Sequence, residues 1–288
     1  MKNKIICYEN YSLSNKSPIR VGGVVKRYYE VNDIDELSNL IKELNNTNTP
    51  YFVFSNASNM VFKDEYDNEV AIKVTAASYK INDNVLYVES GVKLPYLARI
   101  LTSLGYLGWS KIADIPGEIG GSIVSNCEAN GQAISDTLIE VTLVNNKGEI
   151  IIMNKSELQF SYRNSFLKIN EGFVLFSAKF TLVKGNKELL KKELEFYHLK
   201  RKSHQPVGIK TLGSTFKNPS FCKAYELIDG CNLRGYTFNN IKINEKHCNF
   251  LVNINCKPEI VIEYIKHIKT LVLAKYNVVL KEEVNILS

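Results

Sequence analysis

The stretch Ile115-Pro116-Gly117-Glu118-Ile119-Gly120-Gly121 decides how the first half of this chain is interpreted. Its three glycines remove side chains from a short length of backbone, so that N–H groups can approach a ligand closely. The spacing is neither that of the G-x-G-x-x-G fingerprint nor that of a P-loop. Taken alone, the stretch is explained equally well by a tight structural turn.

A second turn of similar character lies earlier in the chain. The short apolar strand Tyr51–Phe54 runs directly into Ser55-Asn56-Ala57-Ser58-Asn59. Residues of these types tolerate unusual backbone angles and offer hydroxyl or amide groups for hydrogen bonding. Two such turns in one domain suggest that backbone amides, rather than a metal, hold a nucleotide pyrophosphate.

The sequence around these turns predicts an α+β fold in two blocks. The first block ends at a lysine-rich, helical run over 184–202, where the composition shifts, and a second α+β block follows. Apolar spacing predicts helices over 32–45, 94–104, 224–228 and 258–276. Strands are expected over 70–74, 85–89, 138–144, 149–153, 173–183 and 247–253, with a final pair around Glu282-Glu283.

Composition excludes several classes of protein. The 288 residues are 45% hydrophobic and 23% charged, which is ordinary for a globular protein, and no apolar window is long enough for a membrane-spanning helix. The formal charge of +6 is modest and not blocky, so it fits an anionic small molecule at least as well as nucleic acid, which usually needs a concentrated basic face. The six cysteines form no C-x-x-C pair, which argues against a structural metal and favours free thiols in a reducing cytoplasm.

Eight ordered motifs along nearly the whole chain carry a family resemblance. Gly213-Ser214-Thr215-Phe216-Lys217-Asn218-Pro219 is the most specific, and it matches G-S-x-F-K-N-P. With these motifs the chain resembles the UDP-N-acetylenolpyruvoylglucosamine reductase (MurB) family, in its compact subtype. The other motifs are Arg20–Gly23, Val53–Met60, Ile115–Gly121, Tyr162–Ser165, Arg201–Pro206, Glu245–Phe250 and Leu280–Val284.

The resemblance implies a fold and an activity. The fold would be a two-part FAD-binding domain of the vanillyl-alcohol-oxidase (PCMH) type over 1–185, with subdomains of roughly 1–75 and 76–185. A smaller α+β substrate-binding domain would follow over 186–288. The activity would be NADPH-dependent, FAD-mediated reduction of UDP-N-acetylglucosamine enolpyruvate to UDP-N-acetylmuramate in peptidoglycan synthesis. From composition and cysteine spacing we also expect a cytoplasmic protein with no metal and no nucleic-acid or membrane partner. The sequence leaves the oligomeric state open, with a monomer favoured.

The resemblance also assigns site residues. Arg163 would stabilise the charge that builds on the substrate carboxylate with help from Glu283, and Ser214 would supply a proton. The residues expected to bind substrate are Tyr162, Lys217 and Asn218. Those expected to bind FAD are Arg20, Ser55, Asn56, Ala57, Ser58, Asn59, Met60, Asp114, Ile115, Pro116, Gly117, Gly120, Gly121 and Ser122.

Two departures from the family pattern leave alternatives open. Ser55-Asn56-Ala57 stands where the family has a glycine-rich turn, and Cys127-Glu128 stands where it has small residues. The alternatives are a related flavin oxidoreductase with another substrate, and a diverged paralogue that binds a nucleotide sugar without turnover. His247 is expected to be a structural, hydrogen-bonded histidine in a strand.

Overall fold

The computed structural model describes residues 5–66 and 69–287, and the chain forms two compact units. Unit 1 consists of Met1–Glu9, Lys26–Asn56 and Asn68–Lys200. Unit 2 consists of Asn10–Val25, Ala57–Asp67 and Arg201–Ser288. Unit 2 is therefore assembled from three separate lengths of chain, and only the last of them belongs to the C-terminal block that the sequence predicts.

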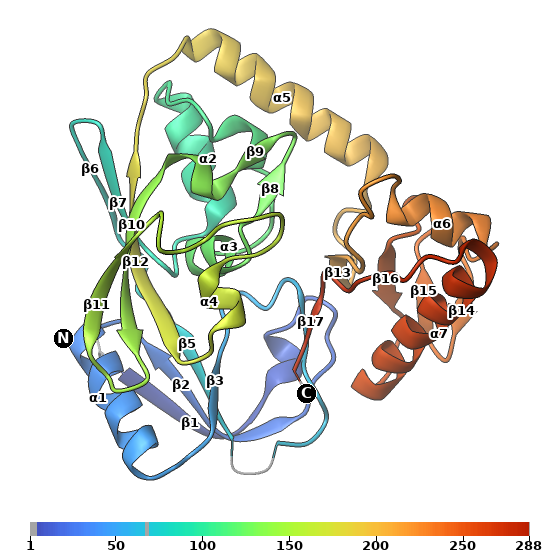
Figure 1. Ribbon diagram of the computed structural model, residues 1–288, viewed down its shortest axis with the longest axis horizontal. Helices are drawn as coiled ribbons and strands as arrows, with labels where there is room; N and C mark the ends of the chain where they lie inside the picture. The colour runs from blue at the N-terminus through green and yellow to red at the C-terminus, as the bar shows by residue number, and fades with distance from the viewer. Residues whose placement is uncertain (1–4, 67–68, 288) are drawn as a thin grey trace. The chain divides into compact units, whose positions relative to one another are not determined.

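A four-stranded sheet packed against one helix forms the first part of unit 1 (Figure 1). Its strand order is β1-β2-β5-β3, with β5 parallel to both β2 and β3. The helix α1 begins after Asp33, whose carboxylate accepts from the N–H groups of Asp35 (3.0 Å) and Glu36 (3.2 Å). The elements are β1 (Ile5–Ser12), β2 (Val24–Val31), α1 (Ile34–Asn46), β3 (Tyr51–Val53) and β5 (Val70–Val74).

A five-stranded antiparallel sheet forms the second part of unit 1. Its strand order is β11-β10-β12-β7-β6, and α2 and α3 supply residues to its core. Trp109 and Phe180 meet edge to face at 5.3 Å in the centre of this core. The elements are β6 (Tyr79–Asn82), β7 (Val85–Glu89), α2 (Leu94–Ser103), α3 (Ile119–Val124), β10 (Leu138–Asn145), β11 (Ile150–Asn154) and β12 (Phe173–Thr181).

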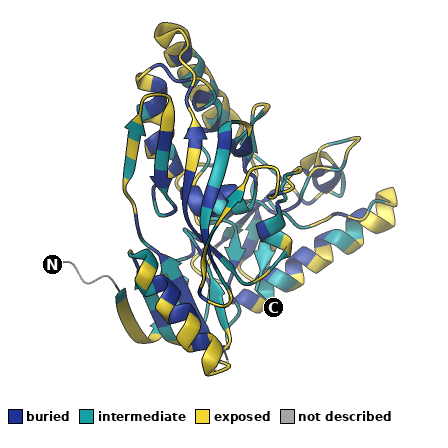
Figure 2. Cartoon of the chain, turned by 60° about the vertical axis from the view of Figure 1, so that its left-hand side comes forward, coloured by how far each residue is buried: buried dark blue, intermediate teal, exposed yellow. Residues whose placement is uncertain are grey.

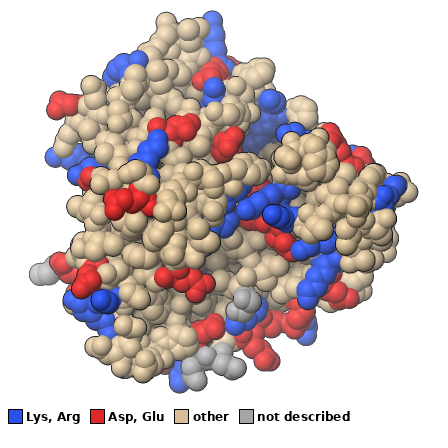
Figure 3. Space-filling view, viewed as in Figure 1, with Lys and Arg blue, Asp and Glu red and all other residues tan. Residues whose placement is uncertain are grey.

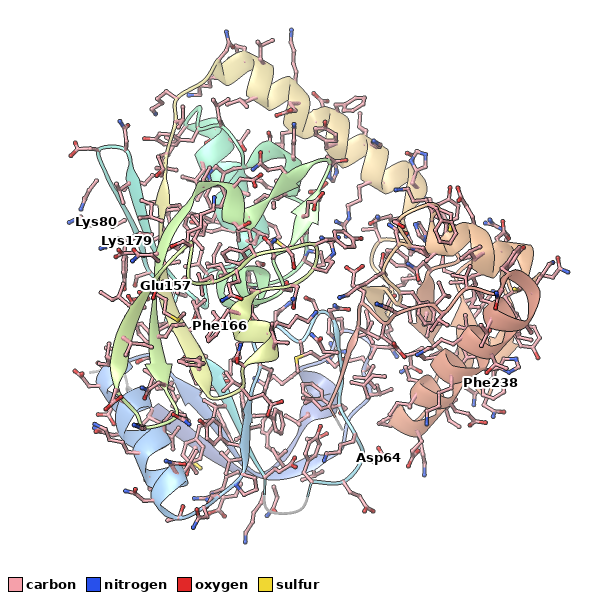
Figure 4. All side chains as sticks on the ribbon, in the orientation of Figure 1. Asp64, Lys80, Glu157, Phe166, Lys179 and Phe238 are labelled. Carbon is pink, nitrogen blue, oxygen red and sulfur yellow. The ribbon has the colours of Figure 1, made fainter. Side chains whose placement is uncertain are left out.

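Unit 2 has a core of its own, built around an antiparallel sheet and two helices. Its strand order is β13-β16-β15-β14, and a short parallel pair joins β17 to β4. Phe238, labelled in Figure 4, stacks on the fully buried Tyr264 of α7 at 5.1 Å. The elements are β4 (Met60–Val61), β13 (Thr211–Ser214), α6 (Ala224–Gly230), β14 (Thr237–Phe238), β15 (Ile241–Ile243), β16 (Phe250–Asn253), α7 (Pro258–Tyr276) and β17 (Asn285–Ile286).

Shorter elements and one long surface helix complete the chain. Figure 2 shows how little of β1, next to the N-terminus, is buried. Within the described residues, no helix is both long and apolar enough to cross a membrane. The remaining elements are the 3-10 turns η1 (Leu13–Asn15), η2 (Ser110–Ile112) and η3 (Ile134–Thr137), the strands β8 (Glu128–Ala129) and β9 (Gln132–Ala133), and the helices α4 (Phe166–Ile169) and α5 (Lys187–His204).

The structure confirms the predicted helices and most strands and corrects three details. Glu282-Glu283 lies before β17 and has no strand pair around it, although Glu282 forms an isolated bridge with Phe216. His247 precedes β16 in a turn rather than lying in the strand. The glycine-rich stretch is only partly a turn, because Ile119 begins α3.

The compact units also differ from the contiguous division at residue 185. Contacts assign 186–200 to unit 1 and two N-terminal segments to unit 2. Compactness does not say which residues bind a cofactor or a substrate. The division into a FAD-binding part over 1–185 and a substrate-binding part over 186–288 therefore stays a prediction.

Two leucines at one end of α2 provide a test of the core of the five-stranded sheet. Leu101 is fully buried, whereas Leu104 directly after the helix is 45% exposed. We expect Leu101→Ala to lower the free energy of unfolding by about 2–5 kcal/mol, because it leaves a cavity. Leu104→Ala should cost less than about 1 kcal/mol. Urea unfolding followed by circular dichroism measures both, and equal losses would contradict this description of the core.

Candidate active site

Close packing, rather than open space, surrounds the glycine-rich stretch. A Cβ on Gly120 would lie 2.8 Å from the Cβ of Ser90, and one on Gly121 would lie 3.1 Å from the Cβ of Ser55. The N–H of Ile119 donates to Val92 O and that of Gly120 donates to Ser90 O, both at 2.9 Å. These two amides are thus used inside the unit, and the glycines bring α3 against β7 and against the polar turn.

The polar turn after β3 carries strained backbone. Ala57 has a φ of +47°, a conformation that costs an alanine of the order of 1 kcal/mol, whereas Asn56 does not adopt a positive φ. The turn therefore places its left-handed residue at alanine and not at the more tolerant asparagine. The Asn59 Nδ2 donates to Glu283 O at 2.8 Å, which joins the turn to the last segment of unit 2.

A buried carboxylate lies where the polar turn meets the glycine-rich stretch. Glu118 is 5% exposed, and its Oε2 accepts from Ser55 Oγ at 2.8 Å. Its Oε1 accepts from Lys73 Nζ on β5, also at 2.8 Å. Neither Glu118 nor Lys73 is predicted as a site residue from the sequence. Their separation of 45 residues carries no signal of a contact.

Asp114, expected at the cofactor site, binds two basic side chains. One carboxylate oxygen accepts from the guanidinium of Arg99 on α2. The other accepts from His198 Nδ1 on α5 at 3.0 Å. Asp114 therefore attaches α5 to the segment that leads into the glycine-rich stretch.

Arg163 lies in a tight turn with strained backbone. Ser161 and Asn164 exchange two backbone hydrogen bonds of 3.1 Å around it, and Arg163 has a φ of +55°. Strained non-glycine residues of this kind cluster at functional sites. The Arg163 guanidinium lies 5.3 Å from the ring centre of Tyr162, which is 47% exposed.

The turn that carries Arg163 is tied to the end of α3 from both sides. Ser165 is fully buried, and its hydroxyl donates to Val124 O at 2.7 Å. Asn126 Nδ2 donates to Ser161 O at 2.9 Å. The Asn126 Oδ1 is buried and accepts no hydrogen bond from the described residues. A ligand with an N–H or O–H group would satisfy it.

Unit 2 holds the Ser214 segment between two neighbouring segments. Ser214 ends β13 and pairs with Phe250 of β16, directly after Gly213, whose φ is +75°. The buried Asn249 side chain accepts from Phe216 N (2.9 Å) and donates to Phe216 O (2.8 Å). Asn249 lies within the Glu245–Phe250 motif, but its contact with Phe216 is not predicted from the sequence.

The segment before β17 holds the Ser214 loop from its other side. Glu283 N donates to Thr215 O, and Lys217 N donates to Lys281 O, both at 2.8 Å. The fold of unit 2 thus brings Ser214 and Glu283 onto adjacent segments. The Glu282 carboxylate is paired with Lys269 of α7 at 2.6 Å.

Two further predicted residues have backbone-directed contacts. The Asn218 Oδ1 accepts from Ala224 N at 3.0 Å, at the start of α6. Arg20 is exposed, has a φ of +62°, and donates to Asn15 O at 3.1 Å. Both side chains therefore support local backbone.

The surroundings of His247 agree with a structural role. Its Nδ1 accepts from Asn249 N at 3.3 Å. Burial lowers the pKa of His247, and the positive charges of Arg234 and His204 lower it further. Among the described residues, no group of three His, Cys, Asp or Glu side chains could hold a metal ion.

The chain matches known families in both of its halves. Residues 205–287 match the UDP-N-acetylenolpyruvoylglucosamine reductase C-terminal domain, and residues 25–154 match a FAD-binding domain. A UDP-N-acetylenolpyruvoylglucosamine reductase from Caldanaerobacter subterraneus subsp. tengcongensis is 31% identical over 97% of this chain and 93% of its own length. One from Clostridioides difficile is 32% identical, over 93% of this chain and 89% of its own.

The chain belongs to the UDP-N-acetylenolpyruvoylglucosamine reductase family. The crystal structure of a family member (MurB) from Thermus caldophilus superposes with a TM-score of 0.84 at 25% identity, covering 99% of each chain. A 6-hydroxy-D-nicotine oxidase from Arthrobacter nicotinovorans, at 15% identity, shares the fold alone, with a TM-score of 0.50 over 64% of this chain and 43% of its own. These likenesses confirm the predicted fold, a FAD-binding domain with a second, C-terminal α+β domain.

Cys127, next to Asn126, provides a test of burial near the Arg163 turn. Burial raises the pKa of its thiol to about 12, although the Ser122 hydrogen bond and the Arg163 charge act in the opposite direction. We expect native Cys127 to resist iodoacetamide at pH 8, because the thiolate is the reactive form. The exposed Cys7 should react.

Peptide mass spectrometry measures the two modifications, with protein unfolded in urea as the control in which both cysteines react. The pKa of Cys127 in the folded protein lies above the usual value of 9.0. Its neutral thiol therefore contributes in full to the free energy of unfolding below pH 9, and this contribution is lost as the pH rises toward 12. Labelling of native Cys127 as fast as Cys7 would contradict its burial.

Proposed function

We propose that this chain catalyses the NADPH-dependent, FAD-mediated reduction of UDP-N-acetylglucosamine enolpyruvate to UDP-N-acetylmuramate in peptidoglycan synthesis. Membership of the reductase family over nearly the whole chain carries this proposal. The family's most specific motif, Gly213–Pro219, lies in a loop that is hydrogen-bonded on both sides. The enzyme is a flavin-dependent oxidoreductase.

Features of the described residues fit a bound FAD. The buried Oδ1 atoms of Asn59 and Asn126 accept no hydrogen bond from the described residues, and the ribityl hydroxyls and ring N–H groups of FAD are suitable donors. The residues proposed to hold FAD are those of the polar turn, Ser55–Met60, and of Asp114–Ser122, together with Arg20. When bound, FAD supplies the hydride that it takes from NADPH.

We assign charge stabilisation to Arg163 and Glu283, and proton transfer to Ser214. Hydride addition to an alkene conjugated with a carboxylate drives negative charge onto that carboxylate. A guanidinium and hydrogen-bond donors directed at it lower the barrier. Arg163 supplies the cation, and Glu283 assists it at the substrate carboxylate. The Ser214 hydroxyl gives its proton to the adjacent substrate carbon.

The substrate also needs groups that bind it without reacting. Its diphosphate requires cations. We assign one of these contacts to the Lys217 side chain on the Gly213–Pro219 loop. Tyr162 is assigned a contact with the substrate, and the Asn218 contact with Ala224 favours a role in shaping the loop. Ser214 lies on the same loop as Lys217 and Asn218, so a change in the loop's shape would also move the Ser214 hydroxyl.

The proposed setting of the reaction follows from its reactants. NADPH and UDP-sugars are cytoplasmic metabolites, so we place the enzyme in the cytoplasm. On the face shown in Figure 3, Lys and Arg side chains are interspersed with Asp and Glu. On this face the charges do not form the concentrated basic patch or stripe that is typical of a nucleic-acid-binding protein.

Ser214→Ala tests the proton-transfer assignment. We expect flavin reduction by NADPH to stay within about threefold of wild type, because that half-reaction needs no proton from Ser214. Substrate reduction should slow by about 10²–10⁴-fold, the usual contribution of a positioned acid. Stopped-flow absorbance near 450 nm separates the half-reactions, and equal loss in both would contradict the assignment.

Lys217→Ala and Arg163→Ala distinguish binding from charge stabilisation. A diphosphate contact made equally in the ground and transition states contributes uniform binding, so Lys217→Ala should raise the KM for substrate about tenfold with little change in kcat. Arg163→Ala should lower kcat by about 100-fold or more, because its partner's charge grows during the reaction. Steady-state NADPH oxidation measures both, and a fall in kcat alone for Lys217→Ala would make Lys217 a support of the Ser214 loop.

The two alternatives make different predictions in the same assay. A reductase of another substrate would bind FAD but would not oxidise NADPH in response to the enolpyruvyl sugar nucleotide. A paralogue without turnover would bind the sugar nucleotide and leave NADPH unchanged. Purified wild-type protein that stays colourless after incubation with FAD would contradict the proposed function itself.

A further inference from the structure

Glu118 is the only acidic residue among the buried polar residues of the described chain. Its side chain is 7% exposed, and that of its partner Lys73 is 15% exposed. Both carboxylate oxygens are engaged at 2.8 Å, one by Lys73 Nζ and the other by Ser55 Oγ. The pair carries no net charge while both partners are present.

The bonds of Glu118 join three separate segments of unit 1. Ser55 follows β3 and Lys73 lies on β5, and both strands belong to the four-stranded sheet. Glu118 directly precedes α3, which packs in the core of the five-stranded sheet. Glu118 therefore fixes the two sheets of unit 1 to each other beside the contact of Gly121 with Ser55.

Stability alone gives little reason for a charge pair at this position. Well-packed apolar side chains of similar volume often stabilise a protein as well as a buried ion pair does. The hydrogen bond also fixes the direction of the Ser55 hydroxyl, because an ionised carboxylate can only accept. While that bond is present, Ser55 Oγ cannot donate its proton to a phosphate oxygen.

We propose that Glu118 is a positioning residue for FAD, and that Lys73 neutralises it so that the anionic FAD diphosphate is not repelled. This inference rests on the proposed function, because it takes the polar turn and the glycine-rich stretch as the FAD-binding segments. The Ser55 hydroxyl donates its proton to Glu118, so the FAD phosphates are left to the backbone N–H groups of the turn.

The two single variants have opposite electrostatic consequences. Glu118→Gln weakens the bonds to both Ser55 and Lys73, whereas Lys73→Met removes only the bond between β5 and the glycine-rich stretch. Glu118→Gln leaves a buried positive charge near the diphosphate, whereas Lys73→Met leaves a buried negative one. We therefore expect Lys73→Met to weaken FAD binding by at least 100-fold, Glu118→Gln by about tenfold, and the double variant by an intermediate factor.

A second pair of the same chemistry serves as the matched control. Lys179, labelled in Figure 4, lies on β12 and pairs with Glu140 on the neighbouring strand β10. Its Nζ lies 2.8 Å from Glu140 Oε1. This pair is more exposed, with side chains 48% and 22% accessible. Glu140→Gln and Lys179→Met should leave the dissociation constant for FAD within twofold of wild type.

The measurement is quenching of FAD fluorescence on titration with full-length protein stripped of flavin, together with urea unfolding of the same preparations. A purely structural pair predicts that both single variants weaken FAD binding equally and in proportion to their lost stability. That result, or unchanged affinity in both, would overturn the proposal. Removing both members of a buried pair also restores stability, so recovery of affinity in the double variant that merely follows regained stability is the structural outcome and would overturn the proposal. An affinity order in which Lys73→Met binds FAD more weakly than Glu118→Gln at equal loss of stability supports it.

If a charge-removing variant does not fold, two milder variants test whether Glu118 positions the turn for FAD. Lys73→Arg keeps the charge and should hold FAD within about threefold, whereas Ser55→Ala removes one bond and should weaken FAD three- to tenfold. Ser55→Ala with unchanged FAD affinity would overturn the positioning role. Failure of the wild-type protein to bind FAD would instead reject the proposed function, so the two failures are distinguishable.

Discussion

The close approach of α3 to β7 and to the polar turn is the constraint on which unit 1 depends. It requires a residue without a side chain at Gly120, where a Cβ would lie 2.8 Å from that of Ser90. The same approach places the Glu118 carboxylate within reach of both Ser55 and Lys73. The two sheets also share a hydrophobic core that includes Val144 of β10 and Val174 and Phe176 of β12. At the Glu118 contact they are joined in addition by steric fit and by a charge pair.

Unit 2 uses hydrogen bonds where unit 1 uses close packing. The Asn249 amide pairs with both backbone groups of Phe216, and the segment around Glu283 bonds to Thr215 from the other side. The Ser214 loop is thus fixed at its backbone and leaves its side chains for chemistry. A rigid loop suits a hydroxyl group that must be aimed at a carbon atom, because small misplacements cost large factors in rate.

Local sequence patterns were sufficient to predict most elements of this fold. The Asp33 cap and the apolar spacing of Leu37, Leu40 and Leu44 specify α1, and the structure places the helix there. The family motifs specified the fold class and the cofactor. The roles of the individual site residues stay predictions, because they depend on a bound substrate and cofactor.

Contacts between distant residues could not be predicted from local patterns. Nothing near Lys73 or Glu118 in the sequence indicates that they pair, and the Asn249 contact with Phe216 joins residues 33 positions apart. The failed strand pair around Glu282-Glu283 has a similar cause. That segment forms an isolated bridge with Phe216 instead of a ladder, because its partner is a loop.

The three-segment construction of unit 2 has a consequence for synthesis on the ribosome. Its core contains Ile19, Val21 and Val61 together with residues that follow Arg201, so the early segments have no complete core to enter until the last third of the chain emerges. Contacts so distant in sequence form slowly and leave apolar surface uncovered meanwhile. Until then, the apolar side chains of Ile19, Val21 and Val61 stay exposed, and a chaperone that binds nascent chains would shield these segments.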